Sequence, residues 1–254
     1  MKRSTISANW KRLAVIFFWI AAWQCISILV AQELLVPAPL VVLKTLVKLV
    51  QTTDFWFSSL LSLLRIVVGF LLAVVVGMFL AVCMKRSRIL SLLVAPLVKF
   101  CSTVPVASFI ILALVWIETE QLPSFISFFM VIPIVTENIK KGLKETDVQL
   151  LEMAQIYRMG KWYTLRYVWI PSVMPYFLTA CTTGLGIAWK SGVAAEVICR
   201  PEFSIGKQLQ NAKIYLETSE VFAWTIVIII LSLVLEKLLV TGTEKLSKRY
   251  QPGR

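Results

Sequence analysis

The sequence predicts an all-α membrane protein with six transmembrane helices and a short amphipathic helix in a cytoplasmic loop. Of its 254 residues, 58% are hydrophobic and only 16% are charged. Its mean hydropathy of +0.80 is far above that of soluble proteins. Several uncharged runs approach the roughly 20 residues that a helix needs to cross a hydrocarbon core.

Six apolar segments account for the predicted helices. The four longest uncharged runs cover residues 13–31, 66–84, 100–117 and 167–189. Two shorter runs, residues 121–136 and 221–235, become spans if polar side chains at their ends reach the headgroups. We therefore predict one six-helix membrane domain over residues 13–241, between cytoplasmic ends at residues 1–12 and 242–254.

Basic residues indicate which loops are cytoplasmic, because loops rich in Lys and Arg stay on that side of the membrane. They cluster before the first predicted helix and after the second, fourth and sixth, whereas the opposite loops hold fewer. Both termini and the long loop at about residues 140–166 are therefore predicted to be cytoplasmic. These loops, beside anionic lipid, explain most of the net charge of +12, so no nucleic-acid partner is expected.

Several kinds of chemistry are disfavoured by the residue types. The sequence has no histidine, and its five cysteines form no CxxC pair, so neither a metal site nor a disulfide framework is predicted. It also contains no GxxxxGK[ST] phosphate-binding loop. We therefore expect no catalytic residues and no cofactor bound by this chain.

The predicted loop at residues 140–166 contains a segment that is basic, aromatic and only half apolar, unlike its surroundings. Thr146 followed by Gln149 fits a capping box, which predicts a short helix starting there. The predicted apolar face of this helix consists of Leu150, Met153, Ala154 and Tyr157. Such a helix either rests on the lipid surface or docks onto a cytoplasmic partner.

The same segment resembles the EAA motif of permease subunits of ATP-binding-cassette (ABC) importers. That motif begins with Glu-Ala-Ala, has a Gly four residues after the last Ala, and closes with Ile-x-Leu-Pro. The corresponding residues here are Glu152, Met153 and Ala154 at the start and residues 168–171, ending in Pro171, at the close. Arg158 stands where the Gly is expected and Gly160 follows it closely, so the sequence does not fix the turn inside the motif.

The resemblance extends over about residues 58–240 to the branch of these permeases for nitrate, taurine, aliphatic sulfonates and thiamine-precursor pyrimidines. The residues that match patterns of this branch are Arg65, Gly69, Gly77, Pro105, Ala107, Pro133, Asn138, Gly142 and Glu196. The resemblance implies the type I ABC importer permease fold, in which the EAA loop forms a coupling helix on an ATPase subunit.

Partners and site residues also follow from the resemblance. The chain would form a homodimer, bind two cytoplasmic ABC ATPases that carry ATP and Mg²⁺, and receive its solute from an extracytoplasmic binding protein. It would lie among the lipids of a bacterial inner membrane. The residues expected to couple to the ATPases are Glu152, Met153, Ala154, Arg158, Gly160 and Pro171. Those assigned to the translocation path are Arg65, Pro105, Trp189, Lys190 and Glu196.

Three cations, Arg65, Lys99 and Lys190, lie in or near predicted spans, where a charge facing lipid costs at least ~2.5 kcal/mol. Either Lys190 or Arg65 contacts a polar or anionic solute, or the cations pair with acids or reach the headgroups. The acids considered for such pairs are Glu196 and Glu137. Trp189, beside Lys190, would stack on a solute ring or lie at the membrane interface.

Two other functions remain open from the sequence. A secondary transporter would need inverted repeats and acids that couple ions within its spans, and the sequence shows neither a repeated half nor a carboxylate pair in a span. An energy-coupling scaffold without a path of its own would also dock on ATPases. The sequence assigns no particular solute, and we expect only that it is small and polar or anionic.

Overall fold

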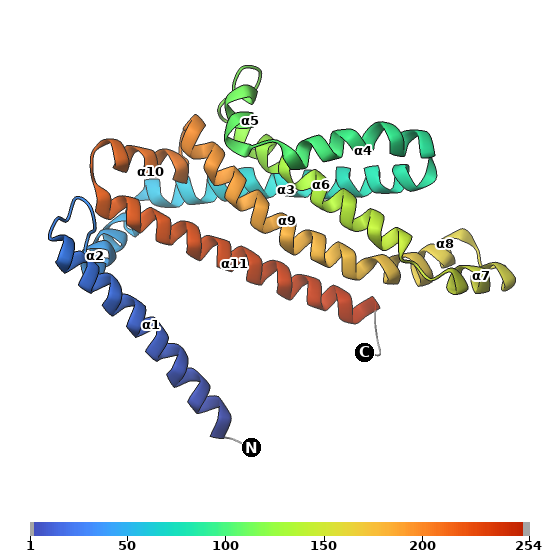
Figure 1. Ribbon diagram of the computed structural model, residues 1–254, viewed down its shortest axis with the longest axis horizontal. Coiled ribbons are helices and arrows are strands. Elements are labelled where there is room, and N and C mark those ends of the chain that lie inside the picture. The colour runs from blue at the N-terminus through green and yellow to red at the C-terminus, as the bar shows by residue number, and fades with distance from the viewer. Residues whose placement is uncertain (1–2, 251–254) are drawn as a thin grey trace.

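Helices form every regular element of residues 3–250, the part of the chain whose backbone the computed structural model describes; side chains are described for Trp10 and residues 14–242. In chain order the elements are α1 (Arg3–Val30), α2 (Pro39–Val50), α3 (Thr53–Arg86), α4 (Arg88–Thr103), α5 (Val106–Ala113), α6 (Leu122–Lys144), α7 (Val148–Ile156), α8 (Lys161–Thr164), the π-helical segment η1 (Leu165–Trp169), α9 (Ile170–Cys199), α10 (Ile205–Ile214) and α11 (Thr218–Tyr250). Figure 1 shows α3, α6, α9 and α11 as the long helices of one bundle.

The all-α membrane class predicted from hydropathy is confirmed, whereas the described chain has four helical stretches that meet the length of a span, or five if the bent pair of α4 and α5 is one span, and not six. The helical stretches long and apolar enough to cross a membrane are Thr53–Arg86, Leu122–Lys144, Lys161–Cys199 and Thr218–Gly242. A shorter apolar stretch, Ala14–Val30, lies in α1, and α4 with α5 forms a bent apolar pair. These stretches correspond to the six predicted segments, and Arg65 and Lys99 lie inside α3 and α4 as expected.

The third predicted helix, which contains the apolar run 100–117 and is expected to begin near Ile89, does begin there but is not continuous. α4 ends at Thr103 and α5 begins at Val106, and the two helices are bent by 106° at the break. The cause is Pro105, which has no amide hydrogen to donate and disfavours the helical conformation of the residue before it. Val104 is accordingly extended, with φ −69° and ψ 129°. The third apolar segment is therefore a broken span or a re-entrant segment.

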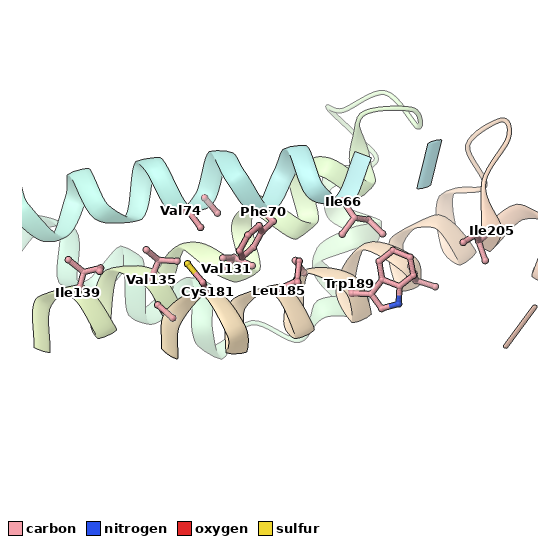
Figure 2. Packing of buried hydrophobic residues seen from close by; sticks show 14 of the residues in the cluster. Ile66, Phe70, Val74, Val131, Val135, Ile139, Cys181, Leu185, Trp189 and Ile205 are labelled. Carbon is pink, nitrogen blue, oxygen red and sulfur yellow. The ribbon is translucent and has the colours of Figure 1, made fainter. Parts of the chain in front are cut away.

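α3, α6 and α9 form the centre of the bundle. Figure 2 shows their side chains meeting in one buried cluster, which includes Phe70 and Val74 from α3, Val131 and Val135 from α6, and Leu185 and Trp189 from α9. Close approach of α3 to α6 requires glycine at position 69, because a Cβ atom there would overlap the carbonyl oxygen of Ser124. Ser127 Oγ donates a hydrogen bond of 3.1 Å to the carbonyl oxygen of Ala188, which ties α6 to α9.

The bundle has two different ends (Figure 1). One carries α7, α8 and the connection from α3 to α4, and we call it the α7 end. The other carries α2, α10 and the start of α3, and we call it the α10 end. Because α3, α6 and α9 run between these ends, the residues predicted to couple to a partner and those predicted to meet a solute lie in separate regions.

α1 leads away from the other long helices in Figure 1. It touches α11 where the ring of Trp23 stacks on that of Phe222, with the ring centroids 5.6 Å apart. Many of its apolar side chains remain uncovered, including Phe17 at 75% exposure and Trp19 at 67%. In a membrane, these side chains face lipid or a second protein chain.

Candidate functional site

The helix predicted in the long loop is present as α7, but its cap is one residue later than the capping box suggested. Asp147 is the N-cap, and its Oδ1 accepts a hydrogen bond of 2.8 Å from the amide of Gln149. Thr146 is buried instead, and its hydroxyl donates to the carbonyl oxygen of Gly142 at 3.1 Å. A carboxylate therefore stands at the start of α7, where the helix dipole favours negative charge.

The turn inside the motif lies at Arg158, where the EAA motif has its glycine. Arg158 has a left-handed backbone with φ 50°, and its amide donates to the carbonyl oxygen of Gln155 at 2.9 Å. The amide of Met159 reaches the carbonyl oxygen of Ala154 at 2.9 Å, which completes a Schellman motif. Gly160 has an ordinary φ of −60° and caps α8. The departure from the motif therefore changes the residue and not the position of the turn.

α7 buries less of its surface than the predicted amphipathic pattern implied. Of the four residues predicted on its apolar face, Ala154 is buried, whereas the other three are 40–75% exposed. Val148, Glu152 and Ile156 follow one another at intervals of one helical turn along a stripe roughly opposite Ala154. Val148 is 64% exposed and Ile156 is 79% exposed. The helix thus presents apolar side chains outward around one carboxylate.

Pro171 does not mark the beginning of the fifth helical run. The run already begins at Lys161 and continues through η1 into α9, ending at Cys199. Pro171 lies at the start of α9, directly after the π-helical segment. Because proline has no amide hydrogen, one backbone hydrogen bond of a regular helix cannot form at this position. Through this continuous run, α8 is joined directly to the centre of the bundle, and α7 is joined to α8 by the turn at Arg158.

At the α10 end, Arg65 lies in a polar cluster that the sequence did not predict. Its guanidinium pairs with the carboxylate of Glu120 and donates hydrogen bonds to the carbonyl oxygens of Glu202 at 3.1 Å and Phe203 at 3.3 Å. The amide of Glu202 donates to Glu120 at 2.7 Å. Arg65 is thus paired with an acid, as one interpretation expected, but its partner is Glu120 and not Glu196 or Glu137.

Glu196 lies in the same region and is fully buried. Its Oε2 accepts hydrogen bonds from Ser62 Oγ at 2.7 Å and from the amide of Gly206 at 3.3 Å. Ser62 Oγ in turn accepts from the amide of Ile205 at 2.9 Å. A Cβ atom at position 206 would overlap the backbone of Glu196, so only glycine fits there. Glu196 and Ser62 therefore hold the first amides of α10 against α3 and α9.

Lys190 is exposed on α9 and lines a cavity of about 390 Å³ between α9 and α11. Other polar residues of the wall are Thr182, Thr183, Ser232 and Glu236. Among the ion pairs of the described residues, none involves Lys190. The acid suggested for such a pair, Glu196, is turned toward Ser62 instead. Lys190 is therefore available to meet a solute or lipid headgroup.

The remaining predicted residues of the path are Trp189, which lines the same cavity as Lys190, and Pro105, which does not. Trp189 is 2% exposed, and its Nε1 donates to the carbonyl oxygen of Ile228 at 3.2 Å. Its indole thus packs α9 against α11 and forms part of the wall of the cavity that holds Lys190. Pro105 is exposed at the break between α4 and α5. Lys99 is exposed on α4 and takes part in no ion pair among the described residues.

Three residues of these sites were missed from the sequence: Ser62, Glu120 and Asp147. Polar contacts on one side of α3 were indicated by the serines of this otherwise apolar stretch, Ser58, Ser59 and Ser62. Asp147 directly before the helical pattern was a second candidate cap beside Thr146. Glu120 gave no local signal, because its pairing with Arg65 depends on how the chain folds.

The chain belongs to the family of binding-protein-dependent transport system inner membrane components, whose model matches residues 73–250. A probable ABC transporter permease of Brucella melitensis is 27% identical over 216 residues, which are 84% of this chain and 86% of that protein. The taurine transport system permease protein TauC of Escherichia coli is 25% identical over 237 residues, with 91% and 84% covered. The putative aliphatic sulfonates transport permease protein SsuC of Bacillus subtilis is 26% identical over 215 residues, with 82% and 76% covered.

A solved structure supports the same fold. A chain of an amino acid ABC transporter crystallised with histidines superposes with a TM-score of 0.55 at 20% sequence identity, covering 76% of this chain and 90% of that chain. The fold is therefore that of a type I ABC importer permease. With the family match, this makes the chain an integral membrane transport component of the ABC permease class.

Proposed function

We propose that this permease subunit couples solute import to ATP hydrolysis on a separate cytoplasmic ATPase, and that the ATPase, which binds ATP and Mg²⁺, docks on α7. The observation that carries the proposal is the outward stripe of Val148, Glu152 and Ile156. Val148 and Ile156 are 64% and 79% exposed on a helix that is anchored to the bundle through buried Ala154. Exposed apolar side chains around one charge fit a helix-in-groove contact with a protein partner.

The alternative that α7 rests on lipid is disfavoured by its charges. Helices that lie on membranes carry Lys and Arg on their polar face, because the cytoplasmic leaflet is anionic. α7 has no basic residue between Val148 and Ile156, while Asp147 caps it and Glu152 lies on its exposed stripe. We infer that these carboxylates would be repelled by anionic lipid and face basic groups of the ATPase.

The long loop sets the orientation in this proposal. With α7 in the cytoplasm, the α7 end is cytoplasmic, both termini are cytoplasmic, and the α10 end faces an extracytoplasmic binding protein. The basic residues of the connection from α3 to α4, Lys85, Arg86 and Arg88, lie on the same side, as the positive-inside rule requires. The membrane would be the inner membrane of a bacterium.

We also propose that two copies form the path. The uncovered apolar side chains of α1 are compatible with this arrangement, since in a membrane they contact either lipid or a second copy. Lys190 and the polar residues of its cavity would line the route of a small polar or anionic solute. Relatives named for taurine, aliphatic sulfonate and bicarbonate transport support a solute that carries an anionic group. Lys190 and the hydroxyl groups suit such a group, and Glu236, in the same wall, would face the positive end of a zwitterionic solute.

Purification of the affinity-tagged chain from its native membrane tests this function against the two alternatives. The account predicts that an ABC ATPase co-purifies, that two copies of this chain are present in each complex, and that ATP hydrolysis rises when the binding protein and solute are added. A secondary transporter would be recovered without an ATPase. An energy-coupling scaffold would bring a separate small solute-binding membrane protein.

A further inference from the structure

An apolar cavity lies at the α7 end, where α3, α6 and the start of α9 meet. Its volume is about 340 Å³, and every residue that lines it is apolar. The wall includes Met78 and Val82 from α3, Leu143 from α6, Trp169 from η1, and Val173 and Phe177 from α9. A cavity lined in this way offers water no hydrogen-bond partners, so its natural occupant is apolar.

Positive charge stands beside this cavity. Lys85 Nζ lies 3.8 Å from the centroid of the Trp169 ring and donates to the carbonyl oxygen of Leu143 at 2.6 Å. Lys85 thus touches two of the residues that line the cavity. Arg166, which is exposed, directly follows the lining residue Leu165 in the chain. Lys144 follows Leu143 but lines a separate pocket with Glu137 and Glu145. No acidic residue lines the cavity. The occupant therefore combines an apolar body with a negatively charged end.

The place of the cavity favours a lipid as its occupant. A hydrocarbon chain is flexible and narrow enough to follow a cavity of about 340 Å³. The cavity lies beside the last turns of α3, just before the basic connection to α4. Basic residues at the end of a span lie at headgroup depth.

We propose that this cavity binds one acyl chain of an anionic membrane phospholipid, whose phosphate is held by Lys85. The bound chain would pack against Trp169 and Val173, on either side of the junction between η1 and α9. Since this junction connects α7 and α8 to the bundle, the lipid would stiffen the link between the loop and the spans. The site depends neither on the identity of the solute nor on an ATPase.

Photolabelling of the full-length chain in nanodiscs tests the site. The probes are phosphatidylglycerol and phosphatidylcholine that carry a diazirine in the acyl chain, and mass spectrometry maps the labelled peptides. Labelling by phosphatidylglycerol is expected to concentrate on the peptides that hold Met78, Leu143 and Val173. One cation near the membrane surface contributes about 1 kcal/mol, so Lys85→Gln should reduce the preference for phosphatidylglycerol about fivefold. Lys99→Gln, on exposed α4, should leave that preference unchanged.

A second variant tests the cavity itself. Val173→Trp fills the space and should remove most of the label from these peptides. Val68→Trp, on a part of α3 that is 49% exposed, should leave the labelling in place. Labelling spread evenly over exposed faces, equal labelling by both lipids, or cross-links between two copies at these peptides would overturn the proposal. If Val173→Trp does not fold, the wild-type peptide map and the lipid preference of Lys85→Gln still test whether the cavity binds an anionic lipid.

Discussion

Ser62 and Glu196 lie 134 positions apart in the sequence and are joined by a hydrogen bond of 2.7 Å. Both side chains are fully buried, and together they accept the amides of Ile205 and Gly206 at the start of α10. A single serine hydroxyl thus connects α3, α9 and α10. The position of α10 depends on this polar contact as well as on apolar packing.

Ser62→Ala is expected to lower the free energy of unfolding by about 1–3 kcal/mol, because it leaves a buried amide and part of a buried carboxyl group without a partner. Thermal unfolding in detergent and hydrogen exchange across α10 measure the effect. Ser102→Ala is the matched control, since that exposed hydroxyl bonds only to carbonyl oxygens of its own helix. Equal melting temperatures for the two variants would contradict the role of Ser62.

The pair of Arg65 and Glu120 should show a modest coupling energy. The Glu120 side chain is 46% exposed, so solvent screens the pair, and a double-mutant cycle with Arg65→Gln and Glu120→Gln should give roughly 1 kcal/mol. Arg65→Gln alone should cost more than Glu120→Gln alone, because Arg65 also donates to two carbonyl oxygens. Melting temperatures of the two single variants and the double variant measure these terms. Strictly additive effects would show that the two residues do not interact.

Arg158→Gly should stabilise the end of α7. The left-handed conformation of Arg158 costs a residue with a Cβ atom about 1 kcal/mol. Glycine avoids this cost but loses more conformational entropy on folding, which offsets part of the gain. Gly160→Ala is the contrasting change, because its φ is −60° and the nearest atom to an added Cβ would be 3.8 Å away. That change should lower stability by no more than about 1 kcal/mol, because alanine is a poorer N-cap than glycine for α8, and it should not affect α7. Slower hydrogen exchange in α7 for Arg158→Gly, and little change for Gly160→Ala, would verify the position of the turn.

Lys190→Met should remove solute-stimulated ATP hydrolysis by the assembled complex and leave the melting temperature unchanged. The reason is that Lys190 has no ion-pair partner among the described residues, so no acid is left unpaired, and methionine keeps most of the apolar volume. Lys99→Met, on α4, is the control and should preserve stimulation. Loss of thermal stability in Lys190→Met with normal stimulation at low temperature would assign Lys190 a structural role.

The general fold could be predicted because hydropathy and charge are local properties of the sequence. The break at Pro105 was missed because the apolar run continues through it, although proline and the residue before it carried the necessary signal. The cap of α7 was misplaced by one residue, since Thr146 and Asp147 are both suitable caps. Only the structure shows that the Thr146 hydroxyl bonds to Gly142.

The polar contacts at the α10 end were beyond sequence reasoning for a different reason. Glu120 lies 55 positions from Arg65, and Glu196 lies 134 positions from Ser62. Which acid meets which donor depends on the packing of α3, α6 and α9, and one sequence alone offers no measure of that packing. The same limit applies to Trp189, whose neighbour Lys190 suggested solute contact although its indole packs between α9 and α11.

The most direct test of the central claim compares two identical substitutions at opposite ends of the bundle. Ile156 on α7 is 79% exposed and Ile214 on α10 is 54% exposed. If α7 is the docking helix, Ile156→Asp buries a new charge in the contact and should weaken recovery of the ATPase roughly tenfold or more, which corresponds to at least about 1.4 kcal/mol. Ile214→Asp should leave recovery unchanged. Equal recovery of the ATPase with both variants would contradict docking on α7.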